Sequence, residues 1–265
     1  MTSTAPLVRT DPVAPGEGPG NDGRPLRGVL WDLDGTVVDS EPAWFAAETM
    51  LVERYGGTWS VDQAVALVGS DLKHTAAVLR DAGVPLDPTD LIATLIEFVA
   101  ERVVATRPWR PGILRALAEC REAGLACALV SMSWRRFTTA VAGLVPGTFA
   151  VIVSGDEVQR GKPEPDAYLI GAAKLGLEAA DCVAIEDSPT GVAAALAAGI
   201  ATVAVPNPTV TNPGAIAPAP GLALLGSTDQ LTVPLLRRLH KANWALALRT
   251  AGTCPGTSTS RTASP

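Results

Sequence analysis

The sequence of 265 residues has only two histidines, His74 and His240. So small a supply nearly excludes metal sites and catalytic triads that depend on imidazole. The four cysteines form no C-x-x-C pair, and two of them, Cys127 and Cys182, lie in apolar runs. We therefore expect reduced thiols in the core rather than a disulfide framework or a zinc site.

Basic residues are few and scattered, with 21 Lys and Arg against 27 Asp and Glu and a formal net charge of -6. Binding to nucleic acid or to an anionic membrane needs a basic face, so neither partner is expected. The most apolar segment, 191–204, contains Gly199 and is shorter than the ~20 residues that a membrane span needs. No stretch resembles a signal peptide. We expect a cytoplasmic protein, and its oligomeric state stays open.

Hydrophobic residues make up 47% of the chain and charged residues 18%. A chain of this length and composition suits one α/β domain with a smaller domain inserted into it. Residues 1–26 are rich in Pro, Gly and Thr, and residues 251–265 in Ser, Thr and Gly. We predict that both segments are disordered.

Five short apolar runs predict strands, and their apolar residues are continuous rather than alternating. This pattern is typical of strands covered by helices on both faces. Helices are predicted at 113–123, which ends before Gly124, and at 165–175. The sequence therefore predicts a doubly wound parallel α/β sheet of the Rossmann type. The predicted strands are 28–31, 127–130, 150–153, 182–185 and 201–205.

One interval lacks strands and contains four helical stretches instead, at 43–55, 61–68, 72–82 and 89–105. Apolar residues at helical spacing in the last stretch favour a small bundle. We predict an inserted α-helical cap at 41–109, with the catalytic core at 27–40 and 110–250. The core also contains a loop after Val205 and a final helix at roughly 229–248.

The first predicted strand is followed by Asp32-Leu33-Asp34-Gly35-Thr36. Ligands of α/β sheets bind beyond the carboxyl ends of the strands, so both carboxylates are expected in that crevice. Two such charges repel unless a cation or proton lies between them. An ordinary acidic turn would explain the motif if it stood alone.

Three later segments add polar groups at strand ends. Ser131 follows the second strand, Lys162 precedes a helix opened by Pro165, and Glu186-Asp187 follow the fourth strand. Each has an ordinary interpretation on its own: Ser131 as a helix N-cap, Lys162 as a solvated loop residue, and Asp187 or Ser188 as another N-cap. Together they put four carboxylates against one ammonium, which favours a hard cation, Mg²⁺.

These motifs, in this order, resemble those of the haloacid dehalogenase superfamily, in the subgroup of phosphoglycolate phosphatases and β-phosphoglucomutases with a helical cap. The resemblance covers residues 28–206 and implies a Mg²⁺-dependent phosphatase acting on a small phosphorylated metabolite. Trp31, where Phe is usual, and Met132, where Asn or Ser is usual, depart from the pattern. The family's dehalogenases lack the second aspartate and its phosphonate hydrolases replace it, so Asp34 favours phosphate esters.

The resemblance also implies residue roles. Asp32 is the nucleophile that forms an aspartyl phosphate, and Asp34 is the general acid and base. Ser131 and Lys162 bind the phosphoryl oxygens. Mg²⁺ is held by the Asp32 carboxylate, the Asp34 carbonyl and Asp187, with Glu186 behind them.

Two cap residues, Ser70 and Lys73, lie where the family's cap loop approaches the site, and they are candidates for binding the leaving group. An N-cap Ser70 and a solvated Lys73 are equally compatible with the sequence. Trp44 and the pair Arg135-Arg136 are interpreted as packing and exposed residues, respectively.

Two other functions share these residues. A sugar phosphomutase of the β-phosphoglucomutase type would pass the aspartyl phosphate to a second hydroxyl instead of water. A non-catalytic module that binds a phosphorylated ligand would be expected to have lost a catalytic carboxylate, and none is lost here.

Overall fold

The structure is a computed structural model that describes residues 24–68, 70–208, 211 and 213–251. Nearly all of the two terminal segments predicted to be disordered lies outside the described residues, as does Cys254. Among the described residues, no helix combines the length and the apolar character that a membrane span requires.

Six parallel strands form one sheet in the order β3-β2-β1-β4-β5-β6. The chain builds outward from β1 to β3, then crosses to β4 on the other side of β1. In such sheets the point where the strand order reverses leaves a crevice at the carboxyl ends. The prediction of a doubly wound parallel sheet is confirmed. The strands are β1 (Gly28–Trp31), β2 (Ala126–Val130), β3 (Val151–Val153), β4 (Cys182–Glu186), β5 (Ala201–Ala204) and β6 (Leu222–Leu224).

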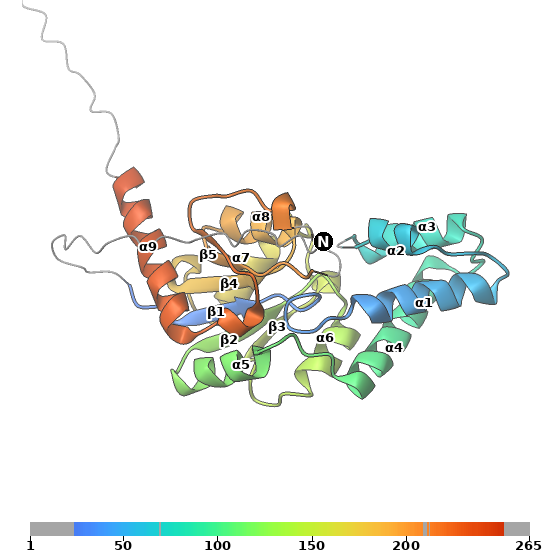
Figure 1. Cartoon of the computed structure of the whole chain (residues 1–265), viewed down its shortest axis with the longest axis horizontal. Coiled ribbons are helices and arrows are strands. Elements are labelled where there is room, and N and C mark those ends of the chain that lie inside the picture. Colours follow the sequence, from blue (N-terminus) through green and yellow to red (C-terminus); the bar gives the residue numbers. More distant parts are fainter. Residues whose placement is uncertain (1–23, 69, 209–210, 212, 252–265) are drawn as a thin grey trace, which may run out of the picture.

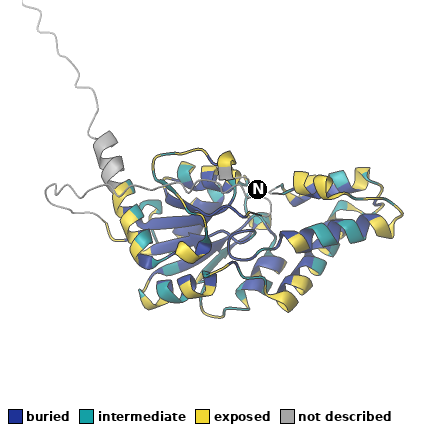
Figure 2. Ribbon diagram, viewed as in Figure 1, coloured by how far each residue is buried: buried dark blue, intermediate teal, exposed yellow. Residues whose placement is uncertain are grey.

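Helices cover both faces of the sheet, so the four central strands are almost wholly buried, whereas the edge strands are only partly buried (Figures 1 and 2). Val29 and Trp31 point to one face and Leu30 to the other, because successive side chains of a strand alternate. One face packs against α5 (Ile113–Glu122), α6 (Arg135–Ala142) and α9 (Val233–Ala251). The other packs against α7 (Asp166–Lys174) and α8 (Pro189–Ala197).

Four helices between β1 and α5 form a separate group beyond the carboxyl ends of the strands (Figure 1). Their starts carry local signals. Ser60 forms a capping box, and the side chains of Asp71 and Asp87 accept backbone N–H groups of the first turn. The inserted helical group of the predicted fold is therefore present. Its helices are α1 (Glu41–Arg54), α2 (Val61–Ala66), α3 (Leu72–Asp81) and α4 (Pro88–Thr106).

The two segments that join this group to the sheet lie side by side. Val38 and Trp109 form an antiparallel bridge, and the Asp39 N–H donates to the Pro108 carbonyl at 2.8 Å. Arg107 ends α4 in a left-handed conformation that turns the chain back. We propose that the cap lies between these two joining segments and spans residues 41–109.

The sequence interpretation missed one strand and misplaced one helix start. β6 follows Gly221 in a segment rich in Pro and Ala, and its three residues are too few for a recognisable pattern. The last helix begins at Val233 rather than near Asp229, because residues 228–230 form a 3-10 turn capped by Ser227. Other 3-10 turns are Gly155–Glu157, Ala179–Asp181 and Pro213–Ala215.

Candidate active site

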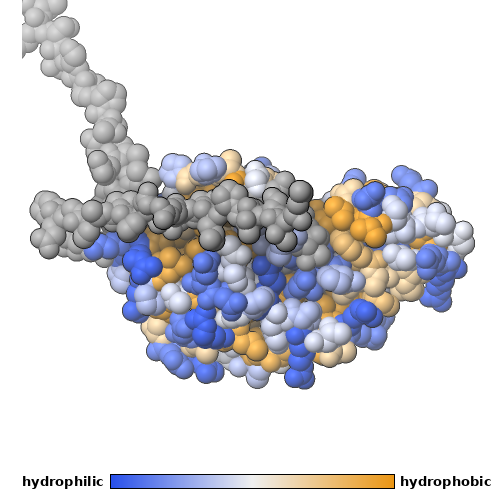
Figure 3. Space-filling model, in the orientation of Figure 1, coloured by the Kyte–Doolittle hydropathy of each residue, from blue (hydrophilic) through white to orange (hydrophobic). Residues whose placement is uncertain are grey.

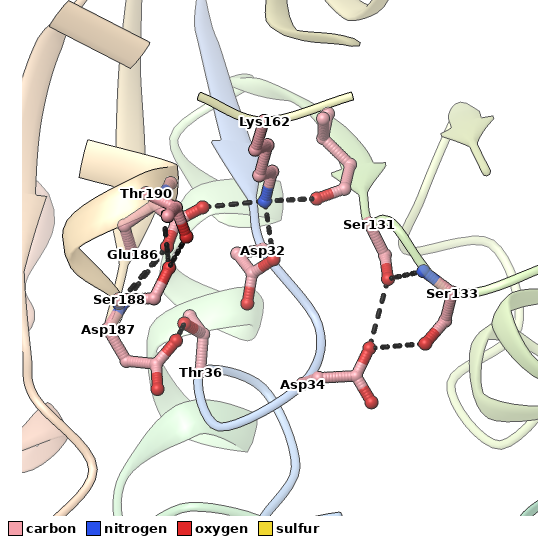
Figure 4. A network of polar contacts seen from close by, with 12 residues as sticks. Asp32, Asp34, Thr36, Ser131, Ser133, Lys162, Glu186, Asp187, Ser188 and Thr190 are labelled. Atoms are coloured by element: carbon pink, nitrogen blue, oxygen red, sulfur yellow. Dashed lines mark hydrogen bonds and ion pairs between the residues drawn. The ribbon is translucent and has the colours of Figure 1, made fainter. Parts of the chain in front are cut away.

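The predicted polar residues meet in one crevice at the carboxyl ends of the strands (Figure 4). β1 carries Asp32 and Asp34 on the loop that follows it, and β4 ends at Glu186 with Asp187 next. β1 and β4 are paired neighbours, so the two acidic segments face each other across the point where the strand order reverses. Residues more than 150 positions apart in the sequence thus share one site.

Lys162 lies between two carboxylates. Its ammonium Nζ is 2.6 Å from Asp32 Oδ1 and 2.6 Å from Glu186 Oε1, and it also donates to the Val130 carbonyl at 3.2 Å. Only 6% of its side chain is exposed. Burial alone would lower the pKa of Lys162, but the two carboxylates outweigh burial and raise it. The interpretation as a solvated loop lysine is wrong.

Glu186 is committed to neighbouring donors at both oxygens. Oε1 accepts from Lys162 and from the Tyr168 hydroxyl at 2.6 Å. Oε2 accepts from the Asp187 and Ser188 backbone N–H groups and from the Ser188 hydroxyl. A methyl group at Gly191 would overlap this carboxylate, so glycine is needed there. Glu186 therefore organises the site and has little capacity left to bind a metal directly.

Asp32 and Asp187 keep acceptor capacity that faces the crevice. Ligand oxygens of Asp32, Glu186 and Asp187 all lie within 4.8 Å of one another. Asp32 Oδ2 is buried and has no hydrogen-bond donor among the described residues, while Asp187 Oδ1 accepts from the Thr36 hydroxyl at 3.1 Å. A buried carboxylate oxygen without a donor is costly unless a cation or proton is bound. These oxygen ligands fit a hard divalent cation such as Mg²⁺.

The surplus of negative charge also raises the pKa values of two of the acids. Burial, followed by the Glu186 carboxylate, raises the pKa of Asp32 to about 7 despite the opposing effect of Lys162. Burial and the charges of Asp32 and Glu186 raise the pKa of Asp187 as well. Ionising both groups at neutral pH therefore requires compensating positive charge in the crevice.

Asp34 points away from this cluster toward a ring of donors. Its Oδ1 accepts from the Ser40 hydroxyl at 2.7 Å and from Trp44 Nε1 at 3.2 Å. Its Oδ2 accepts from the hydroxyls of Ser131 at 3.0 Å and Ser133 at 2.7 Å. The carboxylate is thus oriented from both sides, by the start of the helical group and by the loop after β2.

Helix capping does not account for the polar residues that follow β2 and β4. Ser188 is the N-cap of α8, but this leaves Glu186 and Asp187 unexplained. Ser131 caps no helix, because the N-cap of α6 is Trp134. The hydroxyl of Ser131 donates to Asp34, and it would have to turn to meet a phosphoryl oxygen.

A cavity of about 110 Å³ lies between the helical group and this crevice. Ser70 contributes to its wall, whereas Lys73 is exposed on α3 and does not. Trp44, expected only to pack, also lines the cavity and holds Asp34. Apolar side chains gather on the side of the helical group that faces the sheet domain (Figure 3).

Arg135 and Arg136 do not reach the crevice. They pair with Glu157 and Glu97, respectively; Arg136 is exposed, as the sequence interpretation expected, whereas Arg135 is only partly exposed. A different arginine does support the site: Arg110 is buried and donates to the Gly35 carbonyl at 2.6 Å.

Several supporting residues went unrecognised in the sequence. Ser133 and Thr36 lie inside the motifs, so their closeness to the acids was a usable signal. Arg110 is distant from the motifs in sequence, and Tyr168 lies in α7, shortly after Lys162, where nothing in the residue pattern singles it out.

Comparison with known proteins agrees with this geometry. A family model described as haloacid dehalogenase-like hydrolase matches residues 29–205. Hexitol phosphatase A of Escherichia coli is 37% identical over 191 residues, which cover 70% of this chain and 85% of that protein. The plasmid-encoded protein CbbY of Cupriavidus necator is 35% identical over 205 residues, covering 68% of this chain and 78% of that protein.

A solved structure extends the likeness to the fold. The crystal structure of CbbY from Rhodobacter sphaeroides in complex with phosphate superimposes with a TM-score of 0.70 at 25% identity. The match covers 80% of this chain and 99% of that one.

Proposed function

Since the chain belongs to the haloacid dehalogenase-like hydrolases, we propose that it is a Mg²⁺-dependent phosphatase of a small phosphorylated sugar or polyol, working through an aspartyl phosphate on Asp32. One observation carries the proposal. Asp32 lies 2.6 Å from the Lys162 ammonium; its other oxygen is buried and has no donor in the described part of the chain, and the Asp187 carboxylate lies close by. Its carboxylate is thus held in place and left open to a cation and to phosphorus.

The residues present fit Mg²⁺. Asp32 and Asp187 would hold the ion with the Asp34 carbonyl, while Glu186 keeps Lys162 and the backbone around Asp187 in position. When bound, Mg²⁺ would neutralise charge on the phosphoryl oxygens and on the acids. This assignment agrees with the bonding of Glu186, whose two oxygens already have protein donors.

In the proposed reaction the Asp32 carboxylate attacks phosphorus, and the bond to the leaving oxygen breaks. Asp34, oriented by four donors, gives a proton to that oxygen and later takes one from the water that releases phosphate. Lys162 stabilises charge on the phosphoryl group, and Ser131 is the proposed second contact to it. The cavity under the helical group provides room for the leaving alcohol.

The test compares Asp32→Asn with the exposed Asp81→Asn as a matched control. Asp32→Asn should lower phosphate release from p-nitrophenyl phosphate by at least about a thousandfold, because the nucleophile is lost. Circular dichroism should show both variants folded. Mass spectrometry of the unmodified protein quenched in acid should find a phosphoryl group on the peptide containing Asp32.

Metal dependence is measured in the same assay. Chelation should abolish phosphate release and added Mg²⁺ should restore it. Activity retained by Asp32→Asn, or by the chelated protein, would exclude the proposed mechanism. Release of an isomerised sugar phosphate in place of inorganic phosphate, after addition of a bisphosphate activator, would indicate the phosphomutase instead.

A further inference from the structure

The wall of the cavity formed by α1 contains two carboxyl groups that the proposed reaction does not use. Glu41, Trp44, Phe45 and Glu48 are spaced at i, i+3, i+4 and i+7, so they lie on one face of the helix, and all four line the cavity. Glu41 lies nearer the crevice, since it begins the helix at the crossing from the sheet. Glu48 lies two turns farther into the helical group.

Both carboxyl groups are buried and have unused acceptor capacity. Glu41 is 8% exposed, and its side chain has no hydrogen-bond partner among the described residues. Glu48 is 4% exposed, with Oε2 held by Trp59 Nε1 at 3.1 Å and Oε1 left without a donor in the described part of the chain. An acidic residue at a helix start is favourable on the surface too, so the helix alone does not explain burial. A bound ligand that donates hydrogen bonds to the two carboxyl groups does explain why they are buried.

The charge of the cavity limits what that ligand can be. Of the described residues that line it, Lys162 is the one cation, and it is already paired with Asp32 and Glu186. A second phosphate or a carboxylate on the substrate would lie beside Glu41 and Glu48 without a compensating positive charge. Specificity of this kind comes from the unpaired charge that a wrong partner would bury as much as from attraction of the right one.

Apolar groups alternate with acceptors on the same walls. Phe45, Leu67 and Leu72 line the cavity together with the two glutamates. A polyol presents C–H and O–H groups in a similar mixture, and each of its hydroxyl groups can donate a hydrogen bond to a free carboxyl oxygen and accept one in return. A protonated amine would satisfy the carboxylates but would leave the apolar wall without a matching surface.

We infer that the substrate is the monophosphate of a neutral polyol, and that Glu41 and Glu48 recognise the hydroxyl groups of its leaving part. The inference rests on the proposed function and specifies it further. Glu41 and Glu48 are specificity residues here, since they contact the leaving alcohol and leave the transferred phosphoryl group to Lys162 and its neighbours.

The first test ranks substrates with the unmodified protein at fixed Mg²⁺. A hexitol monophosphate should exceed a hexose bisphosphate, phosphoglycolate and phosphoethanolamine in kcat/KM, each by about a hundredfold or more. p-Nitrophenyl phosphate serves as the reference for the chemistry itself. No hydrolysis of any ester would contradict the proposed function, whereas hydrolysis with preference for the bisphosphate, the acid or the amine would overturn the inference alone.

The second test uses Glu41→Gln and Glu48→Gln, which keep the size of each side chain. Each should lower kcat/KM for the hexitol monophosphate, relative to p-nitrophenyl phosphate, by about tenfold to a hundredfold. The loss should appear mainly as a higher KM. Glu53→Gln, exposed on the same helix, is the matched control and should leave the ratio unchanged. If neither glutamine variant changes the ratio, the assignment of these residues is wrong.

Discussion

Replacing Glu48 by glutamine should stabilise the protein at alkaline pH. Burial raises the pKa of Glu48 from 4.5 to about 7, although the Trp59 hydrogen bond opposes the rise. The folded chain therefore binds the carboxyl proton more tightly than the unfolded chain does. The resulting contribution to stability is fully present below pH 4.5 and is lost as the pH rises through about 7.

The size of the effect follows from the shift. Between 4.5 and about 7 the lost stability amounts to about 3 kcal/mol, because one pKa unit corresponds to about 1.4 kcal/mol. Glutamine stays neutral and keeps an oxygen for Trp59 Nε1. Glu48→Gln should therefore raise the free energy of unfolding by about 3 kcal/mol near pH 8 and by about 1 kcal/mol near pH 5.5. Removing this charge should also lower the pKa of Glu41, which is raised to about 8 by burial and then by the charges of Asp34 and Glu48.

Urea unfolding followed by circular dichroism, at several pH values and constant Mg²⁺, measures the difference from the unmodified protein. In thermal unfolding the gain near pH 8 should be roughly 6 to 12 °C. The exposed Glu53→Gln should show no such dependence on pH. A Glu48→Gln variant that is no more stable at pH 8, or whose gain is the same at both ends of the pH range, would refute the reasoning.

Three further substitutions probe the support of the site. Gly191→Ala should lower activity by at least about a hundredfold, because the added methyl group overlaps the Glu186 carboxylate and must displace it. Phosphate release measures the loss of activity, and a urea titration measures any loss of stability. Tyr168→Phe removes the hydroxyl that donates to Glu186, and the Mg²⁺ concentration for half-maximal activity should rise by about tenfold. Trp44→Phe removes one of the donors to Asp34, and steady-state kinetics should show kcat lower by about threefold to tenfold.

Each of these three predictions has an outcome that would contradict it, and the first also has a control variant. Gly226→Ala places its methyl group in open space and should change neither activity nor stability. An active Gly191→Ala variant would show that Glu186 can move without harm. An unchanged Mg²⁺ requirement in Tyr168→Phe would remove Tyr168 from the support of the metal site, and an unchanged kcat in Trp44→Phe would mean that the remaining donors suffice for Asp34.

The residues that line the crevice from the sheet were predictable because they follow strands. Continuous apolar runs identify buried parallel strands, and parallel strands end at the same edge. Asp32, Asp34 and Ser131 therefore had to lie near Glu186 and Asp187 once the sheet was recognised, whereas the position of Lys162, well beyond the end of β3, was expected from the motif. The family followed from the same motifs. Short or irregular elements such as β6 and the turn before α9 were missed because they have too few residues to show a period.

The sequence by itself determined the sheet, the order of the motifs and the chemistry that their side chains can perform, since these depend on local periodicity and on residue type. Only the tertiary structure decided which face of α1 covers the crevice. That choice depends on the paired crossings at Val38 and Trp109, which orient the helical group. It brings Glu41 and Glu48 over the site as buried acceptors, and no spacing in the chain distinguishes them from acids on a solvated helix.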